Sequence, residues 1–290
     1  MAGRETPTLL DRVGDGAFRA LLRRGLAMPY ERRIAAAGRL GRRLGGVAGY
    51  RARAMEQLAL ARPDLSPQDR RRIADEAIDN AARSLIEHYS AGEFAARTAA
   101  RDPLTGPGLP ALLTARDEGR PAILAPAHFG NFMVFRTALT QRGVRLGVLY
   151  RPMNNPLFES HYRPAMEAIS TPLFPRDRAG TAAMVRHLRG GGIMAIAPDQ
   201  YVKGGAPLTF FGLPARTTLS PAELALRYDA PLFTAHAIRQ PDGLSFEARI
   251  DEPVPQSTPE EMMQEVNDRF EAVIRRHMGQ WMWFHRRWKA

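Results

Sequence analysis

The sequence contains no cysteine among its 290 residues, which excludes disulfides, thiolate chemistry and cysteine-ligated zinc. It also lacks a Gly-x-Ser-x-Gly elbow, a phosphate loop ending in Gly-Lys-Ser/Thr, and histidines spaced as zinc ligands. No secretory signal and no run of about eighteen apolar residues occurs. These absences predict a protein without a metal site that lies in the cytoplasm or on a membrane surface rather than across a membrane.

Lysine is nearly absent as well: of 41 basic residues only Lys203 and Lys289 are lysine, and the others are arginine. The chain has a formal net charge of +11 and a pI near 10.8. A basic surface favours anionic partners, which include phospholipid headgroups, nucleic acid and an acidic carrier protein. Because no aromatic–basic recognition module accompanies the charge, we do not expect nucleic-acid binding.

The excess charge is concentrated at the start of the chain, where residues 1–54 hold twelve arginines and four acidic residues. Leucines at helical spacing between residues 9 and 26 alternate with arginines. This pattern fits either a membrane-surface helix or a helix packed on the core, and from the charge we predict binding of residues 1–54 to anionic membranes. Five glycines within residues 38–49 weaken the next stretch as a helix.

Helices and strands are then predicted in two parts. Residues 55–100 are expected to be helical, and a Pro/Gly cluster at 102–110 marks a boundary. From residue 121 onward apolar runs alternate with amphipathic stretches, with Phe210 and Phe211 placed in a loop. This alternation predicts an α/β fold with a mostly parallel central sheet and helices on both faces. We expect a membrane-facing, basic helical segment at 1–105 and an α/β domain at 106–290.

The stretch PAILAPAHFGNFMVF, at residues 121–135, shows the clearest sign of chemistry. A buried strand is expected to end at His128, with a helix beginning near Phe132. Catalytic groups of open α/β sheets gather at the carboxyl ends of strands, where an imidazole can act as a general base. The alternative is a histidine hydrogen-bonded inside the core. Other strand ends are followed by Arg151, Arg176, Arg178 and Asp199. One base, several cations and a carboxylate suit a reaction on an anionic, acylated substrate.

Six motifs follow one another along the chain: AHFGN (127–131), YRPMNNP (150–156), PRDR (175–178), PDQ (198–200), FFGLPARTT (210–218) and WMWFHRRW (281–288). Together they resemble the lipid A biosynthesis lauroyl/myristoyl acyltransferases, within the lysophospholipid acyltransferase superfamily. The resemblance implies transfer of a fatty acyl chain from acyl carrier protein or a coenzyme A thioester to a lipid acceptor, such as a lipid A precursor, another glycolipid or a lysolipid. It implies no cofactor, anionic membrane lipid as a partner, and a peripheral place on the cytoplasmic face of the inner membrane.

The resemblance also implies roles for individual residues, with His128 as the base and Asp199 as a second catalytic residue. The substrate-binding set is Asn131, Arg151, Arg163, Arg176, Arg178 and Gln200. Arg151 alternatively caps a strand end, and the arginines around Asp177 alternatively form surface ion pairs. An acyl chain needs a dry cleft, so we predict an apolar pocket beside the base. Its lining is expected from Phe129, Phe132, Met133 and Phe135.

Met133 is the sharpest departure from the resembled family, in which a Glu or Asp five positions after the histidine is thought to orient the imidazole. Possible substitutes are a backbone carbonyl or one of three distant carboxylates, Glu87, Glu93 and Glu159. A missing carboxylate predicts a slow enzyme that Met133→Glu would accelerate, or a catalytically silent relative that binds acyl lipid or carrier protein. An arginine expected near Met166 is also absent, and Arg163 is the nearest substitute.

Three further features have structural explanations. His236 lies inside a predicted strand, and His285 lies between aromatic and basic residues, so we expect both to pack rather than to react. The closing tryptophans are typical of a membrane interface. Core packing is the interpretation that we prefer for them.

Overall fold

Five helices precede the first strand of the computed structural model, which describes residues 6–289. They are α1 (Leu9–Leu26), α2 (Tyr30–Val47), α3 (Tyr50–Ala61), α4 (Pro67–His88) and α5 (Ala91–Arg101). Thr8 caps α1 in a capping box with Asp11, and Ser66 caps α4 with Pro67 in the first turn, as the sequence indicates. Residues 1–5 of the predicted basic segment lie outside the described residues.

The glycine-rich stretch is helical, which corrects the expectation of a weak helix. Glycine lowers helix propensity, but in α2 it allows close packing against α4. A side chain at Gly41 would clash with the Cβ of Ala82, and one at Gly45 would approach Ile78 to 2.9 Å. Tertiary packing therefore stabilises a helix that propensity alone disfavours.

The central sheet has seven strands in the order β1-β9-β8-β2-β5-β3-β4. Their bounds are β1 (Leu104–Thr105), β2 (Ala122–Gly130), β3 (Leu146–Tyr150), β4 (Leu173–Pro175), β5 (Ile193–Ala195), β8 (Leu232–Arg239) and β9 (Phe246–Pro253). Within the described residues, β8 and β9 form the antiparallel pair of this sheet, and its other neighbours are parallel. The predicted fold class, mostly parallel with helices around the sheet, is confirmed.

A separate antiparallel hairpin joins β6 (Ala206–Phe210) to β7 (Leu213–Thr217). Phe210 ends β6 and Phe211 lies in its turn with a φ of +53°, so the prediction of a plain loop was wrong for Phe210. Both rings are buried and contact the C-terminal tryptophans. The aromatic residues thus anchor the hairpin to the core.

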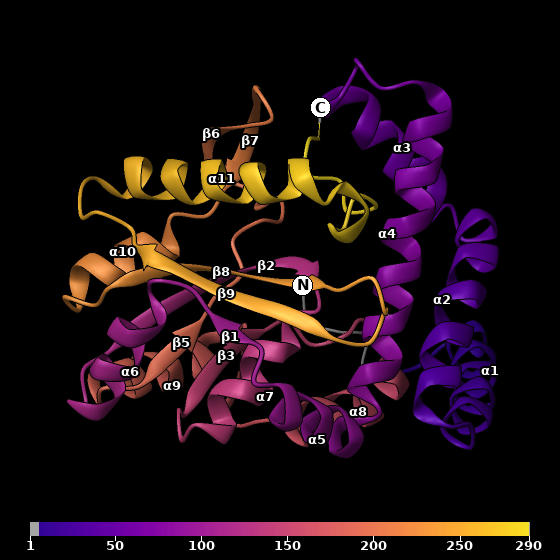
Figure 1. The fold of residues 1–290 in the computed structure, drawn as a ribbon, viewed down its shortest axis with the longest axis horizontal. Coiled ribbons are helices and arrows are strands. Elements are labelled where there is room, and N and C mark those ends of the chain that lie inside the picture. Colours follow the sequence, from indigo (N-terminus) through magenta and orange to yellow (C-terminus); the bar gives the residue numbers. More distant parts are fainter. Residues whose placement is uncertain (1–5, 290) are drawn as a thin grey trace.

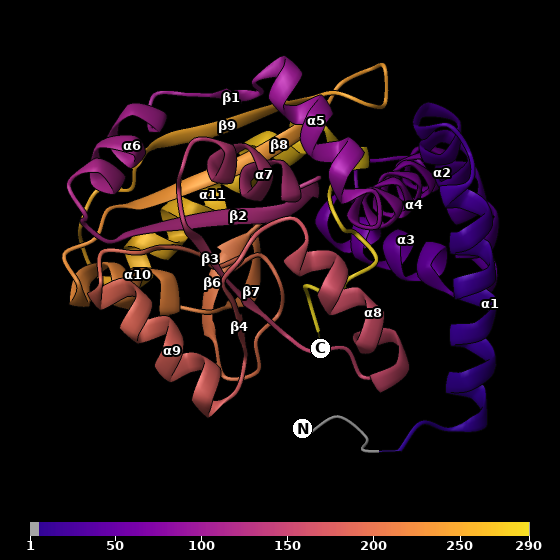
Figure 2. The same cartoon turned by 90° about the horizontal axis from the view of Figure 1, so that it is seen from below.

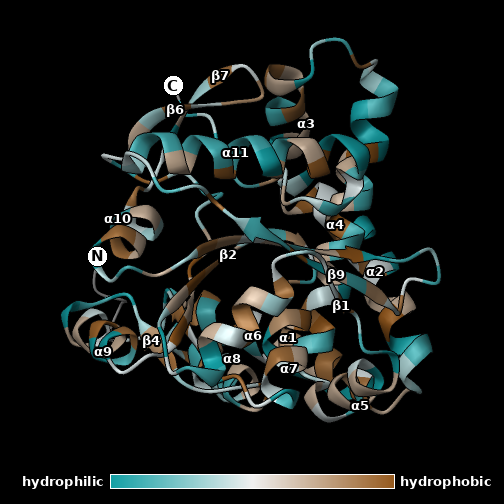
Figure 3. Cartoon of the chain, turned by 60° about the vertical axis from the view of Figure 1, so that its left-hand side comes forward, coloured by the Kyte–Doolittle hydropathy of each residue, from teal (hydrophilic) through white to brown (hydrophobic). Residues whose placement is uncertain are grey.

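The remaining helices connect the strands. They are α6 (Leu109–Asp117), α7 (Met133–Gln141), α8 (Pro156–Glu167), α9 (Arg178–Arg189), α10 (Ser220–Arg227) and α11 (Pro259–Arg276). One buried cluster joins α3, α4, α9, α10 and α11 to one face of β2, and a second joins α2, α5, α6 and α7 to the other face. Figures 1 and 2 show α11 on one side of the sheet, α6 and α7 on the other, and α1–α4 at one end. Hydrophobic residues run along β2 between these layers (Figure 3).

The N-terminal helices share their core with the sheet. Ile34 and Phe94 belong to the cluster that contains β3 and β8, and Leu58 belongs to the cluster that contains α11. The short strand β1 pairs with β9, so the predicted boundary at residue 105 falls at the end of a strand of the main sheet. The division into two domains stays a prediction.

Helix α1 is fastened to α8 and α4 by a polar and aromatic cluster. The buried Asp15 lies 2.9 Å from Nε2 of His161 and 2.7 Å from Nε of Arg19. Burial raises the pKa of Asp15, but these two hydrogen bonds lower it further than burial raises it. Phe18 stacks on the His161 ring and also contacts Tyr89. The inner face of α1 is therefore packed, and its leucines are divided between this face and solvent.

Candidate active site

Strand β2 carries His128 to the carboxyl edge of the sheet, between β8 and β5. The strand extends two residues beyond the predicted end at His128 and stops at Gly130, whose φ is +55°. A Cβ at Gly130 would clash with the backbone carbonyl of Ala237, so glycine is required where the chain turns toward α7. The strand-to-helix junction that the sequence indicated is present at this position.

Asp199 holds His128 at two points. One carboxylate oxygen lies 2.7 Å from Nδ1 of the imidazole, and the other accepts a hydrogen bond of 2.8 Å from the His128 backbone N–H. The aspartate side chain is almost fully buried, at 1% exposed, whereas the imidazole is 21% exposed. No described residue forms a hydrogen bond with Nε2 of His128. The pair is therefore a dyad with one imidazole nitrogen fixed and the other open.

Trp281 supports the dyad from the C-terminal end of the chain. Its indole N–H donates a 2.9 Å hydrogen bond to the same Asp199 oxygen that accepts from the His128 backbone. The backbone of Trp281 also bridges to Phe129 in β2. Sequence reasoning noted the tryptophan motif but missed this contact, because nothing local to either residue indicates that they meet.

The pKa values within the dyad are shifted in opposite directions. Burial disfavours the charged imidazolium, but the negative charge of Asp199 and its hydrogen bond outweigh burial and raise the pKa of His128. Burial also raises the pKa of Asp199, yet His128 and the N–H donors lower it to about 2. Asp199 is consequently ionised across the physiological range and can stabilise a proton on His128.

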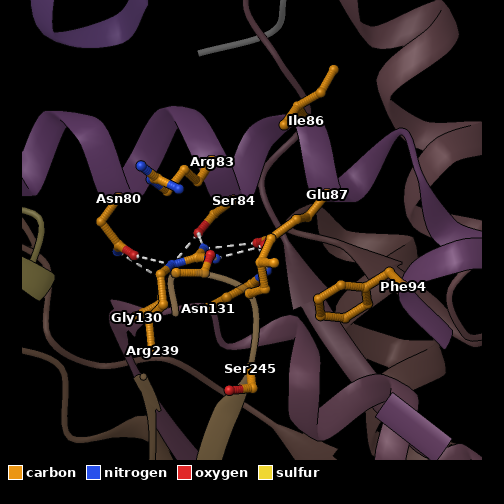
Figure 4. A network of polar contacts seen from close by, with 12 residues as sticks. Asn80, Arg83, Ser84, Ile86, Glu87, Phe94, Gly130, Asn131, Arg239 and Ser245 are labelled. Atoms are coloured by element: carbon orange, nitrogen blue, oxygen red, sulfur yellow. Dashed lines mark hydrogen bonds and ion pairs between the residues drawn. The ribbon is translucent and has the colours of Figure 1, made fainter. Parts of the chain in front are cut away.

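The turn that follows His128 is held by a buried polar network (Figure 4). Arg239 of β8 forms hydrogen bonds of 2.6 and 2.8 Å to the two oxygens of Glu87 in α4. Asn80 donates to the carbonyl oxygen of Gly130 at 2.8 Å, and Asn131 donates to Glu87 at 2.7 Å. The network therefore fixes Gly130 and Asn131, which lie between His128 and the start of α7.

The predicted substitutes for the missing carboxylate do not contact His128. Glu87 pairs with Arg239, Glu93 pairs with Arg33, and Glu159 accepts from the Met153 backbone and the Tyr150 hydroxyl. The carboxylate comes from Asp199 on another strand end. This finding corrects the expectation that His128 relies on a carbonyl or a distant glutamate.

Met133 lies in the core rather than beside the imidazole. It begins α7, is fully buried, and belongs to the cluster on one face of the sheet. A glutamate here would enter an apolar cluster while Nδ1 of His128 is already occupied by Asp199. The reasoning behind activation by Met133→Glu therefore fails, and the opposite result is expected.

The predicted pocket residues are divided between the two faces of the sheet. Phe129 packs with α11 and the tryptophans, whereas Met133 and Phe135 pack in the opposite cluster. Phe132 is half-buried and places its ring 5.4 Å from that of His128. Phe132 borders the imidazole directly and packs against the cluster of Met133 and Phe135, whereas Phe129 lies in the opposite cluster. An acyl pocket beside His128 stays a prediction.

The predicted arginines lie along the carboxyl edge, beyond β5 from the dyad. Arg151 follows β3, and Arg176 and Arg178 follow β4. Adjacent strands are ~4.8 Å apart, so the ends of β3 and β4 are about 10 and about 15 Å from that of β2. All three side chains are exposed, and Arg151 contacts Asn154 at 2.6 Å. Arg163 is also exposed, and it pairs with Glu167 at 2.8 Å.

Two other predicted substrate contacts have structural partners. Asn131 is fully buried, and its oxygen accepts from the Met133 N–H at 3.0 Å, so it holds the start of α7. Gln200 is half-buried, and its amide lies 3.8 Å from the sulfur of Met282. Their predicted role in substrate binding remains untested. The position expected to carry an arginine, Met166, is buried, and its carbonyl accepts from the buried Arg136 at 2.7 Å.

The C-terminal tryptophans and the two other histidines pack as expected. Trp281, Trp283 and Trp288 are all buried, and His236 is buried in β8. His285 accepts a hydrogen bond of 3.1 Å from the Tyr201 N–H, and burial lowers its pKa to about 4. Trp288 exchanges two hydrogen bonds with the buried Gln57 of α3, at 3.0 and 3.2 Å. The closing segment, residues 281–288, thus links the dyad to the N-terminal helices.

Residues 6–289 contain neither a cluster of metal ligands nor a helix suited to span a membrane. No group of three or more His, Asp or Glu side chains is placed to hold a metal ion. None of the helices formed by these residues has the length and apolarity needed to cross a membrane.

Fold and site together define a class: an α/β protein with a parallel sheet and a His–Asp dyad at its carboxyl edge. The family model described as bacterial lipid A biosynthesis acyltransferase matches residues 9–290. The chain belongs to this family.

Curated relatives in this comparison are phosphatidylinositol mannoside acyltransferases. The protein of Mycobacterium tuberculosis (strain CDC 1551 / Oshkosh) is 26% identical over 187 residues, which are 63% of this chain and 59% of the relative. That of Mycolicibacterium smegmatis is 27% identical over 183 residues, 62% of this chain and 60% of the relative. The chain thus spans about three fifths of the length of these relatives.

Proposed function

We propose that this protein transfers a fatty acyl chain from a thioester donor to a hydroxyl group of a lipid acceptor, with His128 as the general base. The observation that carries the proposal is the open Nε2 of a histidine whose Nδ1 is fixed by the buried Asp199. Membership of an acyltransferase family supports the reaction class. The relatives named for acylation of a phosphatidylinositol mannoside support a glycolipid as acceptor, and a lipid A precursor or a lysolipid fits the same chemistry.

The dyad accounts for each proton in this reaction. Nε2 of His128 takes the proton of the acceptor hydroxyl while the oxygen attacks the thioester carbonyl. The new C–O bond forms, the C–S bond breaks, and the imidazolium returns its proton to the leaving thiolate. Asp199 stabilises the imidazolium between these two steps and keeps Nε2 directed toward the substrate. The scheme uses no cofactor, and the donor is an acyl carrier protein or coenzyme A thioester.

The arginines at the carboxyl edge support an anionic substrate. Arg151 and Arg176 are exposed at the ends of β3 and β4, on the same edge as the open Nε2. Guanidinium groups bind phosphate oxygens through paired hydrogen bonds. We assign them to phosphate groups of the acceptor or the donor.

We further propose that α1 contacts the membrane that supplies the acceptor, as a peripheral element on the cytoplasmic face of the inner membrane. Its outer face exposes Leu9 at 79%, Leu10 at 82% and Val13 at 63%. Arg12 and Arg23 on the same helix are also exposed. Exposed leucines beside arginines favour shallow insertion into an anionic lipid surface.

The test is a transfer assay with radiolabelled acyl-coenzyme A and acyl carrier protein donors against a panel of glycolipid and lysolipid acceptors. His128→Ala should abolish labelled product, because it removes the imidazole whose Nε2 is open and whose Nδ1 is held by Asp199. The matched control is His187→Ala, since His187 contacts the Ile193 carbonyl at the amino end of β5, away from the dyad. Equal product from His128→Ala and wild type would refute the proposal. Binding of acyl lipid without turnover in wild type would favour a catalytically silent relative.

A further inference from the structure

A surface groove of about 590 Å³ lies between α9 and α10, and its charged lining is basic apart from one aspartate. Arg178, Arg186 and Arg189 come from α9, and Arg227 comes from the end of α10. Figure 2 shows these helices at the opposite side of the molecule from α1. The groove is therefore separate from the surface proposed to meet the membrane.

The four arginines of the groove form no ion pair within the described part of the chain. No carboxylate in the described part of the chain lies within ion-pair distance of any of the four guanidinium groups. The aspartate in the lining, Asp177, already accepts a hydrogen bond of 2.7 Å from the Gly180 N–H as the cap of α9. All four side chains are exposed, and together they form a concentration of positive charge with which no described carboxylate pairs.

Tyr228 supplies the aromatic part of the groove. Its side chain lines the groove, and its hydroxyl is buried without a hydrogen-bond partner among residues 6–289. The guanidinium of Arg227 lies 5.7 Å from the centre of its ring. Because the hydroxyl is closed to solvent, Tyr228 contributes its ring to the groove surface.

The spacing of the charges indicates an extended ligand. Arg178 and Arg189 are eleven residues apart on one helix, which is about 16 Å along its axis. A single phosphate cannot contact both ends of such a row, whereas a helix with carboxylates on successive turns can. Leu226 is the one large hydrophobic side chain on α9 or α10 that is exposed, and the others in the described residues lie on α1–α3. The two helices thus lack the row of exposed leucines that shallow membrane insertion uses, so the concave, basic surface favours an acidic protein over a membrane.

We propose that this groove is the docking site for an acidic helix of the protein that carries the acyl donor. The proposal rests on the proposed function, to which it adds a place for the carrier. Arginine forks bind carboxylates in paired hydrogen bonds, and complementary charge increases the rate of encounter. The acyl chain is delivered to the dyad from the adjoining carboxyl edge, where α9 begins at Arg178.

The test measures binding of purified holo acyl carrier protein, labelled with a fluorophore, by fluorescence anisotropy. The variant Arg186→Glu/Arg189→Glu reverses two exposed charges of the groove, and Arg227→Glu does so from the opposite helix. Each should raise the Kd about tenfold or more, and added salt should weaken wild-type binding. The matched control is Arg39→Glu/Arg43→Glu, which reverses two exposed arginines on α2. It should change the Kd less than about twofold.

Three results would overturn the proposal. The first is no carrier binding by wild type, and the second is equal weakening of carrier binding by the α2 control. The third is that the groove variants still bind the carrier but lose binding to phosphatidylglycerol vesicles or to pyrophosphate. Thermal unfolding checks that each variant is folded. Transfer from acyl-coenzyme A separates this proposal from the proposed function, because groove variants should keep that transfer while transfer from the carrier falls. If wild type transfers from neither donor, the proposed function fails while the anisotropy measurement still decides the docking site.

Discussion

His128 and Asp199 are 71 residues apart in the sequence, yet their Nδ1 and Oδ1 atoms are 2.7 Å apart. The contact forms because β2 and β5 are neighbours in the sheet, so both residues lie at the same carboxyl edge. The carboxylate that holds the His128 imidazole thus comes from a neighbouring strand end.

Asp199→Asn should slow acyl transfer and change its pH dependence. The uncharged amide cannot stabilise the imidazolium, and comparable changes in serine proteases cost on the order of 10⁴-fold. Asp199 raises the pKa of His128, so the wild-type rate should increase with pH through a value above the usual 6.5, as the base form appears. In the variant this increase should occur at lower pH. Rate–pH profiles of both proteins test this, and an unshifted profile would show that another group titrates.

Met133→Glu should destabilise the protein and slow it. The side chain is fully buried in an apolar cluster, and an unpaired buried carboxylate costs several kcal/mol or remains protonated. Urea unfolding should show the loss, and transfer should fall below wild type. Met133→Leu is the matched control and should cost less than about 1.5 kcal/mol. A faster Met133→Glu enzyme would mean that the new carboxylate reaches His128.

Arg239→Met should lower the free energy of unfolding by about 3–5 kcal/mol, because it leaves Glu87 buried without its cation. Arg72→Ala removes an exposed pair with Glu76 and should cost at most about 1 kcal/mol. Urea denaturation of both variants gives the comparison. Transfer should also fall in Arg239→Met, since Glu87 holds Asn131 behind the dyad. Similar losses for the two variants would argue that the buried network contributes little.

Gly41→Ala should destabilise the protein despite the higher helix propensity of alanine. Its Cβ would clash with Ala82 of α4, so the two helices must separate. Gly14→Ala in α1 is the control, because a Cβ there meets open space and should stabilise by about 0.5–1 kcal/mol. Thermal melts of the two variants should shift in opposite directions. Stabilisation by both would show that α2 and α4 can relax apart.

Leu9→Ser/Leu10→Ser/Val13→Ser should weaken binding to phosphatidylglycerol vesicles at least about tenfold, since each buried aliphatic side chain contributes ~1.5–3 kcal/mol. Leu226→Ser, on the far side of the molecule, is the control and should have no effect. Sedimentation with vesicles measures partitioning, and salt should weaken wild-type binding. Equal partitioning of the triple variant and wild type would exclude α1 as the contact.

The fold was largely predictable because strands and helices of this sheet have strong local periodicity. The run at residues 122–127 and the helix after Phe132 appear close to where the pattern places them. The glycines of α2 misled the prediction, since their effect depends on how closely α4 approaches. The β6–β7 hairpin was not predicted. Its aromatic residues pack against tryptophans near the C-terminus, and this long-range contact has no local sequence pattern.

The site was only partly predictable for a related reason. His128 and Asp199 each follow a strand, and the order of strands in a sheet brings such ends together without indicating which pairs touch. The local pattern directed attention to Met133, whereas the contact that orients the imidazole is non-local. No local sequence pattern indicates that buried residues such as Arg239 and Glu87 form an ion pair. Side-chain pairing across elements is thus the part that requires coordinates.

The closing segment has a consequence for biosynthesis. Trp281 donates to Asp199 and bridges to β2, while Trp288 is held by Gln57 of α3. Every strand of the sheet leaves the ribosome before these residues do. A nascent chain can therefore assemble its sheet and still lack the indole that secures the catalytic carboxylate. The support of Asp199 by Trp281 is therefore completed only after the sheet has been synthesised.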